Sequence, residues 1–111
     1  MTIQVACIVP AKTVENSQTT QYISTSVHTI IDKITSVNYS ASAATISVNI
    51  FASGGSAGNS NLITKTRTIL PGETYTFPEM VGQIMNPGDS LSTIAGTASA
   101  INIRVSGRII S

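Results

Sequence analysis

The sequence predicts an all-β protein: an antiparallel β-sandwich, of jelly-roll or Greek-key type, with about eight strands and one short helical turn near residues 78–85. One observation behind this prediction is the choice of β-branched side chains, with 16 Ile, 8 Val and 15 Thr but only 3 Leu among 111 residues. Such side chains lose rotamer freedom in helices and pack well on a pleated sheet. The second observation is a series of short segments, in which apolar and polar residues alternate, separated by turn residues.

Length and composition predict one folded domain. The chain has 111 residues, and its apolar content of 41% argues against disorder, which goes with low hydrophobicity and high net charge. Residues 18–111 are expected to form the sandwich. Residues 1–17 begin apolar and become polar, which fits either an N-terminal arm or a first strand and loop.

Four strands are expected in the first half of the chain. They cover residues 2–9, 19–24, 27–39 and 45–52. The run 27–39 holds either two strands or one bulged strand, because its apolar positions shift phase. The segment 45–52 is the clearest, since Ile46, Val48 and Ile50 alternate with other residues and put an aliphatic row on one face.

Another strand is expected at residues 62–70. It places Thr64, Thr66 and Thr68 on one face, which we expect to be solvated or paired at an interface. Two turns follow, Leu70-Pro71-Gly72-Glu73 and Asn86-Pro87-Gly88-Asp89. Both fit type II turns, in which Pro sets φ at the second position and Gly supplies a positive φ at the third.

The segment between the turns and the last strand complete the expected fold. Pro78 suits the first position of a helical turn, and Glu79 suits its positive end. The last strand, residues 99–110, should turn Ile101, Ile103 and Val105 inward. Gly107 in that strand indicates a bulge or a close backbone approach.

Charge is scarce, and this excludes several classes of partner. Charged residues are 10% of the chain against about 25% in ordinary domains, with a formal net charge of +1. Nucleic-acid binding needs clustered Lys and Arg, so no nucleic-acid partner is expected. No membrane partner or signal peptide is expected either, because no long apolar run and no basic start are present.

Catalytic, cofactor and metal sites are not predicted. His28 is the only histidine, and no Ser sits in a Gly-x-Ser-x-Gly elbow, so no enzyme is expected. The Gly-rich loop lacks the Lys of a phosphate loop, and the carboxylates are scattered. The single cysteine, Cys7, lies in an apolar run and is expected to be a buried, inert thiol.

A β domain this poor in charge lacks the edge lysines that monomers use to block strand addition, so we expect a homo-oligomer or docking onto a larger scaffold. Residues 50–92 and 103–108 resemble small virion proteins of tailed bacteriophages. The motifs that carry the resemblance are Ser-Gly-Gly-Ser-Ala-Gly, Pro-Gly-Glu-Thr-Tyr, Pro-Glu-Met-Val-Gly, Pro-Gly-Asp and Ser-Gly-Arg. The overall pattern is similar to the jelly-roll decoration or staple proteins of epsilon-fifteen-like short-tailed phages.

The resemblance implies a cement protein, made in the bacterial host cytoplasm, that binds the exterior of the icosahedral shell. It implies the major capsid protein as partner, clamped across subunit boundaries, and a homodimer or other small symmetric oligomer. Alternatives are another virion component, such as a head-tail connector, tail or fibre-associated module, and a host-glycan-binding module.

Three groups of residues are candidates for protein contacts. The first is the exposed loop 53–61, and the second is an apolar group that forms either a docking ridge or core filler. The third is a pair of arginines expected to point outward, either solvated or paired with capsid carboxylates. The candidates are Gly54, Gly55, Ser56, Ala57 and Gly58; Met80, Val81, Ile84 and Met85; and Arg104 and Arg108.

Overall fold

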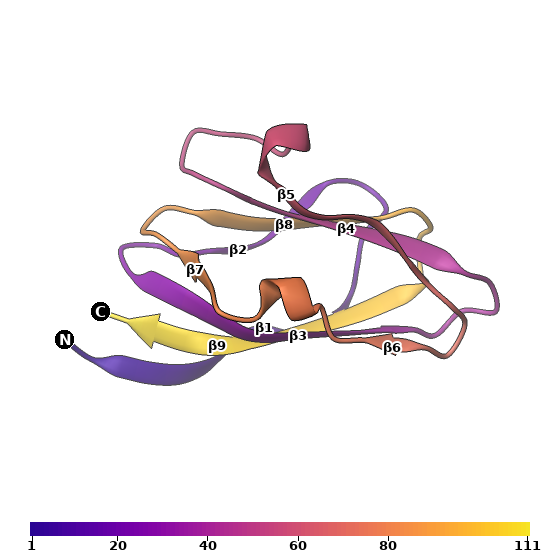
Figure 1. The fold of residues 1–111 in the computed structure, drawn as a ribbon, viewed down its shortest axis with the longest axis horizontal. Coiled ribbons are helices and arrows are strands. Elements are labelled where there is room, and N and C mark those ends of the chain that lie inside the picture. The colour runs from indigo at the N-terminus through magenta and orange to yellow at the C-terminus, as the bar shows by residue number, and fades with distance from the viewer.

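Two antiparallel sheets face each other in the computed structural model, which describes residues 1–111 (Figure 1). Sheet A has the strand order β1-β9-β3-β6, with β7 also paired to β3, and sheet B has the order β2-β8-β4-β5. The strands are β1 (Ile3–Thr13), β2 (Thr19–Ile23), β3 (His28–Asn38), β4 (Ala44–Phe51), β5 (Leu62–Ile69), β6 (Thr74–Tyr75), β7 (Gln83–Met85), β8 (Ser90–Ala95) and β9 (Ile101–Ile110). Two 3₁₀ turns, η1 (Asn59–Asn61) and η2 (Pro78–Met80), complete the elements.

This topology is that of a jelly roll, in which the chain crosses repeatedly from one sheet to the other. β6 pairs with β3 at Ser36 and Val37, and β7 pairs with the same edge of β3 at residues 29–31. The two short strands therefore act as one interrupted strand, which explains why nine strands are present where about eight were expected. The prediction of an all-β antiparallel sandwich is confirmed.

The core lies between the sheets and is built from alternating aliphatic rows. Ile101, Ile103 and Val105 on β9 are all buried, as their spacing predicted. Ile46 and Val48 on β4 face them from sheet B. A period of two places such residues on one face of each strand, so the core follows directly from the alternation in the sequence.

The run 27–39 forms the single strand β3, with a bulge. Its pairing with β9 shifts register between Ile31 and Lys33, which leaves Asp32 as the extra residue. Gly107 lies opposite the bulge, where an added Cβ would stand 2.3 Å from the carbonyl oxygen of Ile30. The close backbone approach expected at Gly107 is confirmed, and only glycine fits there.

The predicted helical turn over residues 78–85 is correct only at its start. Pro78–Met80 forms the 3₁₀ turn η2, with Pro at the first position. Gly82 then takes a φ of +82°, and Gln83–Met85 extends into β7. Pairing with an open edge of β3 supplies those residues with backbone hydrogen bonds, and this outweighs the helical spacing of the apolar side chains.

The uniform threonine face expected on β5 is also wrong. Thr66 has a φ of +44°, and the pairing of β5 with β4 shifts register around it. The bulge changes which side chains point inward, so Thr64 is buried while Thr66 and Thr68 stay exposed.

The two Pro-Gly turns form as expected. Gly72 and Gly88 have φ values of +76° and +92°. In each turn the acidic residue that follows Gly caps the first backbone amide: Glu73 accepts from Leu70 at 2.8 Å, and Asp89 accepts from Asn86 at 2.9 Å. The same Pro-Gly turn, capped by the acidic residue that follows it, therefore occurs twice in the chain.

Asn38, at the end of β3, joins the two sheets and is fully buried. Its Nδ2 donates to the carbonyl oxygens of Ser42 and Ile69, each at 2.8 Å, and Ile69 belongs to sheet B. Its Oδ1 accepts from the backbone amide and the hydroxyl of Ser40. All hydrogen-bonding positions of the amide are occupied, so this side chain closes one end of the sandwich.

Replacing Asn38 by Asp keeps the shape of the side chain but puts an acceptor opposite two carbonyl oxygens. We expect Asn38→Asp to lower the free energy of unfolding by about 3 kcal/mol, because a buried polar group without a partner costs roughly this much. Urea denaturation at pH 7 measures the change. Asn59→Asp, in the exposed loop, is the matched control and should leave stability nearly unchanged; an equal loss in both variants would contradict this role of Asn38.

Candidate interaction surfaces

The Gly-rich loop lies on the outer face of sheet B, above β4 and β5 (Figure 1). Asn49, whose side chain points outward from β4, donates from Nδ2 to the carbonyl oxygen of Gly58 and to Oδ1 of Asn61, at 3.1 and 2.7 Å. Asn61 in turn donates to the carbonyl oxygen of Ser56 at 2.9 Å. The candidates Gly54, Gly55, Ser56, Ala57 and Gly58 therefore lie on a loop whose far end is tied to the sheet.

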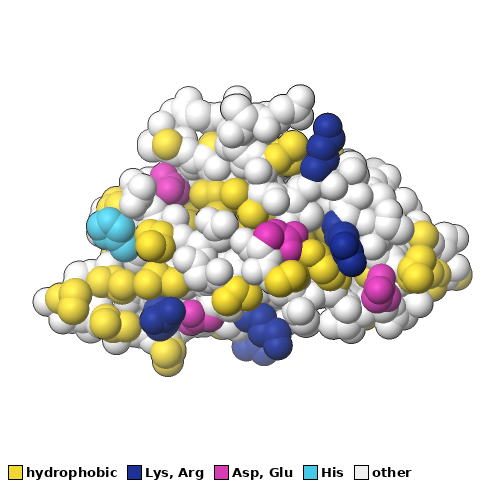
Figure 2. All heavy atoms as spheres, in the orientation of Figure 1, with side chains coloured by type: hydrophobic (Ala, Val, Ile, Leu, Met, Phe, Trp, Pro, Cys, Tyr) yellow, Lys and Arg dark blue, Asp and Glu magenta, His cyan; other side chains and the backbone are white.

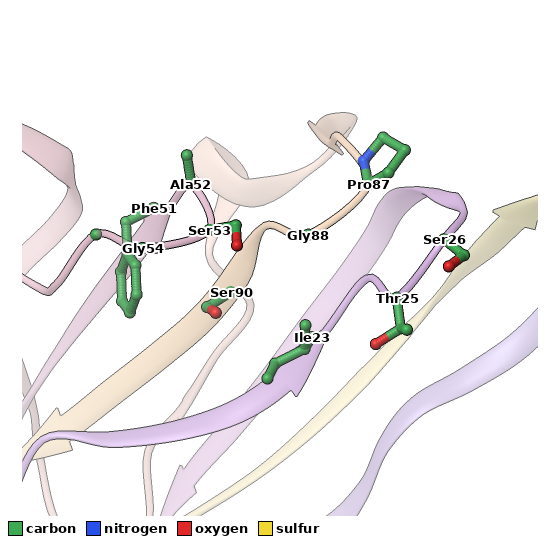
Figure 3. Close-up of a pocket in the computed structure, with 11 residues that line it drawn as sticks. Ile23, Thr25, Ser26, Phe51, Ala52, Ser53, Gly54, Pro87, Gly88 and Ser90 are labelled. Atoms are coloured by element: carbon green, nitrogen blue, oxygen red, sulfur yellow. The ribbon is translucent and has the colours of Figure 1, made fainter.

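A hollow of about 590 Å³ lies between this loop, the β2–β3 turn and the Pro87-Gly88 turn (Figure 3). Gly54 and Gly55 form part of one wall, and the side chains of Phe51 and Ile23 line it from the sheet. The other lining groups are hydroxyls and backbone, and none of the lining residues is charged. The hollow holds no acid or base, so it offers no group for proton transfer.

The apolar group at residues 80–85 divides between core and surface. Met80 and Met85 are fully buried, whereas Val81 and Ile84 are 59% and 60% exposed. Met80 and Met85 therefore fill the core, and a docking ridge stays a prediction for Val81 and Ile84. The extended geometry of β7 separates Ile84 from Met85, because successive side chains of a strand point to opposite faces.

The two arginines of β9 differ in their partners. Arg108 forms a bidentate pair with the carboxylate of Asp32, with Nη2–Oδ1 at 2.8 Å and Nε at 3.1 Å from both oxygens. The hydrogen bonds to Asp32, with the opposite charge, raise the pKa of the Arg108 guanidinium. Arg104 is exposed on the same face. Of these two arginines, Arg104 is the one without an ion pair, because Arg108 pairs with Asp32 within the chain.

Cys7 is exposed, and the prediction of a buried thiol is wrong. The pairing of β1 with β9 shifts register between Cys7 and Val9. The bulge turns both Ile8 and Val9 toward the core, and Cys7 is left on the outer face of sheet A. An apolar run does not reveal such a phase change, because every residue in it is compatible with either face.

No metal site is present, since no three His, Cys, Asp or Glu side chains come together. His28 is exposed at the start of β3. The structure also contains no helix of the length and hydrophobicity needed to span a bilayer.

A polar cluster that the sequence did not predict joins the two sheets along the side where β5 and β6 lie. Glu79 accepts hydrogen bonds from the hydroxyls of Thr64 on β5 and Tyr75 on β6, the latter at 2.7 Å. The Arg67 guanidinium lies 4.2 Å from the centre of the Tyr75 ring. The centre of the Phe77 ring lies 4.6 Å from the centre of the same Tyr75 ring. These side chains come from separate elements, so their spacing in sequence gave no signal.

The electrostatics of this cluster favour an ionised Glu79. Partial burial opposes ionisation, but the hydrogen bonds from Thr64 and Tyr75 and the charge of Arg67 outweigh it and hold the pKa of Glu79 below its ordinary value. Burial, together with the hydrogen bond to Glu79, raises the pKa of Tyr75. The cluster is a structural clamp between sheet edges, because it faces no cavity.

Comparison with known proteins gives a match in structure but not in sequence. No protein-family model and no curated protein matches the chain. A solved structure of Bacillus endospore appendages, described as a novel family of disulfide-linked pili, does match. The match covers 99% of this chain and 88% of that one, with a TM-score of 0.56 and 16% sequence identity. At this identity the likeness shows the fold, and it extends over nearly the whole chain.

This match corrects the predicted function. We expected a capsid decoration protein, with another virion component or a glycan-binding module as alternatives, but the protein that shares the fold forms appendages of the pilus type. A jelly roll with little charge suits many assemblies, so these features did not identify which one. The motif resemblance, the virion location and the major capsid protein as partner stay predictions that no comparison addresses.

The Glu79 clamp predicts a pH dependence of stability. Because the pKa of Glu79 is lower in the folded state than its ordinary value of 4.5, its contribution is present above that value and is lost as pH falls through the folded-state pKa. We expect Glu79→Gln to lower the free energy of unfolding by about 1 kcal/mol at pH 7. Urea denaturation at pH values between 7 and 3 should show that the difference in free energy of unfolding between Glu79→Gln and the unmodified chain becomes smaller in acid.

Tyr75→Phe is the matched control, because it removes one donor to Glu79 and keeps the ring beside Arg67 and Phe77. Between pH 7 and pH 3, the free energy of unfolding of Tyr75→Phe should fall by less than that of the unmodified chain. A difference between the Glu79→Gln variant and the unmodified chain that is constant with pH would contradict the clamp.

Proposed function

We propose that this chain is a non-catalytic structural subunit of a pilus-type surface appendage, and that it acts by assembling with copies of itself. The observation that carries the proposal is the shared jelly roll with a Bacillus endospore appendage protein, which extends over 99% of this chain.

The physical features of the chain suit repeated self-association. Each sheet ends in edge strands, and strand addition at such an edge gives backbone hydrogen bonds without any particular side chains. The net charge of +1 on 111 residues means that copies repel one another little as they accumulate. The chain has 15 Thr and 15 Ser, of which eight are buried, and the remaining hydroxyls keep an exposed fibre hydrated without charge.

Covalent linkage separates this chain from the appendages that it is similar to. Those pili are described as disulfide-linked. The present sequence has one cysteine, which is exposed. One thiol per copy can join two copies, but it cannot continue a covalent chain, because every disulfide consumes two thiols. Beyond a pair of copies, the contacts that these 111 residues make with one another are therefore proposed to be non-covalent.

Electron microscopy of the purified chain tests this function. We expect oligomers or filaments whose amount rises with protein concentration and which persist in a thiol reductant. Cys7→Ser is the control and should assemble like the unmodified chain. A protein that stays monomeric over all concentrations, salts and pH values would contradict the proposal.

A further inference from the structure

We propose that the first half of β1, residues Ile3–Cys7, is an assembly edge at which a second copy of this chain pairs in antiparallel register. The inference rests on the proposed function and names the contact that would begin such an assembly. β1 forms the outer border of sheet A, where no further strand lies beside it (Figure 1). We call this segment the β1 edge.

The backbone groups of the β1 edge point away from the protein in a regular way. Thr2 and Ser111 exchange both of their hydrogen bonds, at 2.8 and 3.0 Å. In an antiparallel ladder such pairs alternate with pairs that exchange none, so Ile3, Val5 and Cys7 direct their N–H and C=O groups outward. The register with β9 is unbroken from Ile3 to Cys7, which keeps these three sets of groups in line.

The second half of β1 is protected against strand addition. Its register with β9 shifts between Cys7 and Val9 and again between Val9 and Lys12. Pro10 has no N–H to offer, and Lys12 places a charge at the edge, where it pairs with Glu15 at 2.9 Å. The expectation that the chain lacks edge lysines is thus wrong for this half of β1. Bulges, prolines and edge lysines are the devices by which proteins block such pairing.

The two edge strands of sheet B carry similar protection. β5 has a bulge at Thr66 and exposes Lys65 and Arg67. β2 has only five residues, and its register shifts between Thr20 and Tyr22. Neither strand offers a run of regular, uncharged backbone comparable to the β1 edge.

The opposite edge of sheet A is protected by interruption. It consists of β6 and β7, which have two and three residues, and the 3₁₀ turn that begins at Pro78 lies between them. Of all the sheet edges, the β1 edge is thus the one without any of these protective devices.

The side chains of the β1 edge favour a protein partner over water. Ile3 and Val5 are 57% and 80% exposed, on the outer face of sheet A. The cross-strand neighbour of Val5 is Arg108, whose charge is offset by Asp32. Figure 2 shows hydrophobic side chains gathered over the end of the molecule where both termini lie. The patch therefore combines apolar surface with a paired charge beside Val5, and the unpaired Arg104 lines the same shallow hollow as Val5 and Cys7.

A second copy is the partner that this segment fits best, because the segment is complementary to itself. In the register that uses all three outward residues, Val5 lies opposite Val5 of the second copy, and Ile3 lies opposite Cys7. All of these side chains are apolar, and no charged residue occurs between Ile3 and Cys7. The resulting contact has two-fold symmetry, as most homodimer contacts do.

The pairing of five residues buries less than the roughly 1,200 Å² of a standard interface, so each contact is weak. A two-fold contact closes on itself, so growth beyond a dimer requires a second, different contact elsewhere on the chain. Weak pairing of isolated chains is therefore the expected behaviour in dilute solution.

Sedimentation of the full chain over a range of concentrations tests the β1 edge. We expect reversible dimerisation, with a dissociation constant that rises by about tenfold or more in Val5→Lys, because the variant places two lysines opposite each other. Val5→Pro should act in the same way. It removes an outward N–H, which leaves the ladder between β1 and β9 intact. Circular dichroism verifies that both variants are folded.

The matched control is Ile84→Lys, on the other edge of sheet A. Ile84 is 60% exposed, and its replacement adds the same charge to an edge strand. We expect this variant to dimerise like the unmodified chain. Equal weakening by Val5→Lys and Ile84→Lys, or a chain that is monomeric at every concentration, would overturn the assignment.

Chemical cross-linking tests the register. In a Cys7→Ser background, Val5→Cys should be joined efficiently to a second copy by a short bis-maleimide, whereas Ile84→Cys should not. Cross-linking of both to the same extent would contradict the two-fold pairing.

The experiments separate this inference from the proposed function. Filaments that form equally well with Val5→Lys and Val5→Pro would overturn the β1 edge and leave the appendage function standing. Dimers that depend on Val5 but never grow longer would support the β1 edge and contradict the appendage function.

Discussion

The unpaired backbone groups at the edges of the two sheets are the constraint on which the rest of this structure depends. A jelly roll hides its aliphatic rows between the sheets, but it leaves edge strands on both of them. Bulges at Thr66 and after Cys7, Pro10, and the interruption between β6 and β7 all lie on those edges. Several irregular features thus lie on free edges, while the bulge at Asp32 lies between the inner strands β3 and β9.

Hydrogen bonds from polar side chains connect the two sheets of this protein. Asn38 and Glu79 each connect the two sheets through neutral donors: the Asn38 amide donates to the carbonyl oxygen of Ile69, and the hydroxyls of Thr64 and Tyr75 donate to Glu79. The contacts of Asn38 add no charge, and the ionised carboxylate of Glu79 is offset by the nearby guanidinium of Arg67. A chain with 10% charged residues can therefore be well ordered and still present a nearly neutral surface to its copies.

The fold of this chain does not specify which assembly it belongs to. Low charge, β-branched strands and open edges indicated a component of an assembly. The prediction that this assembly is a phage shell was wrong, because the features that suggested it are properties of the jelly roll and its turns. The structural match redirects the proposal to a pilus-type appendage, and these 111 residues carry one cysteine.

The sequence by itself determined the fold class, the inward rows of β4 and β9, the two type II turns and the close approach at Gly107, because each depends on local alternation or on backbone freedom. Only the tertiary structure decided which residues lie outside. Bulges at Cys7 and Thr66 reversed the faces predicted there, and pairing with β3 converted the end of a helical pattern into β7. The cluster around Glu79 and the contacts of Asn38 likewise join distant segments. A shift of one residue in strand register turns every following side chain to the other face, and local sequence carries no signal for such a shift.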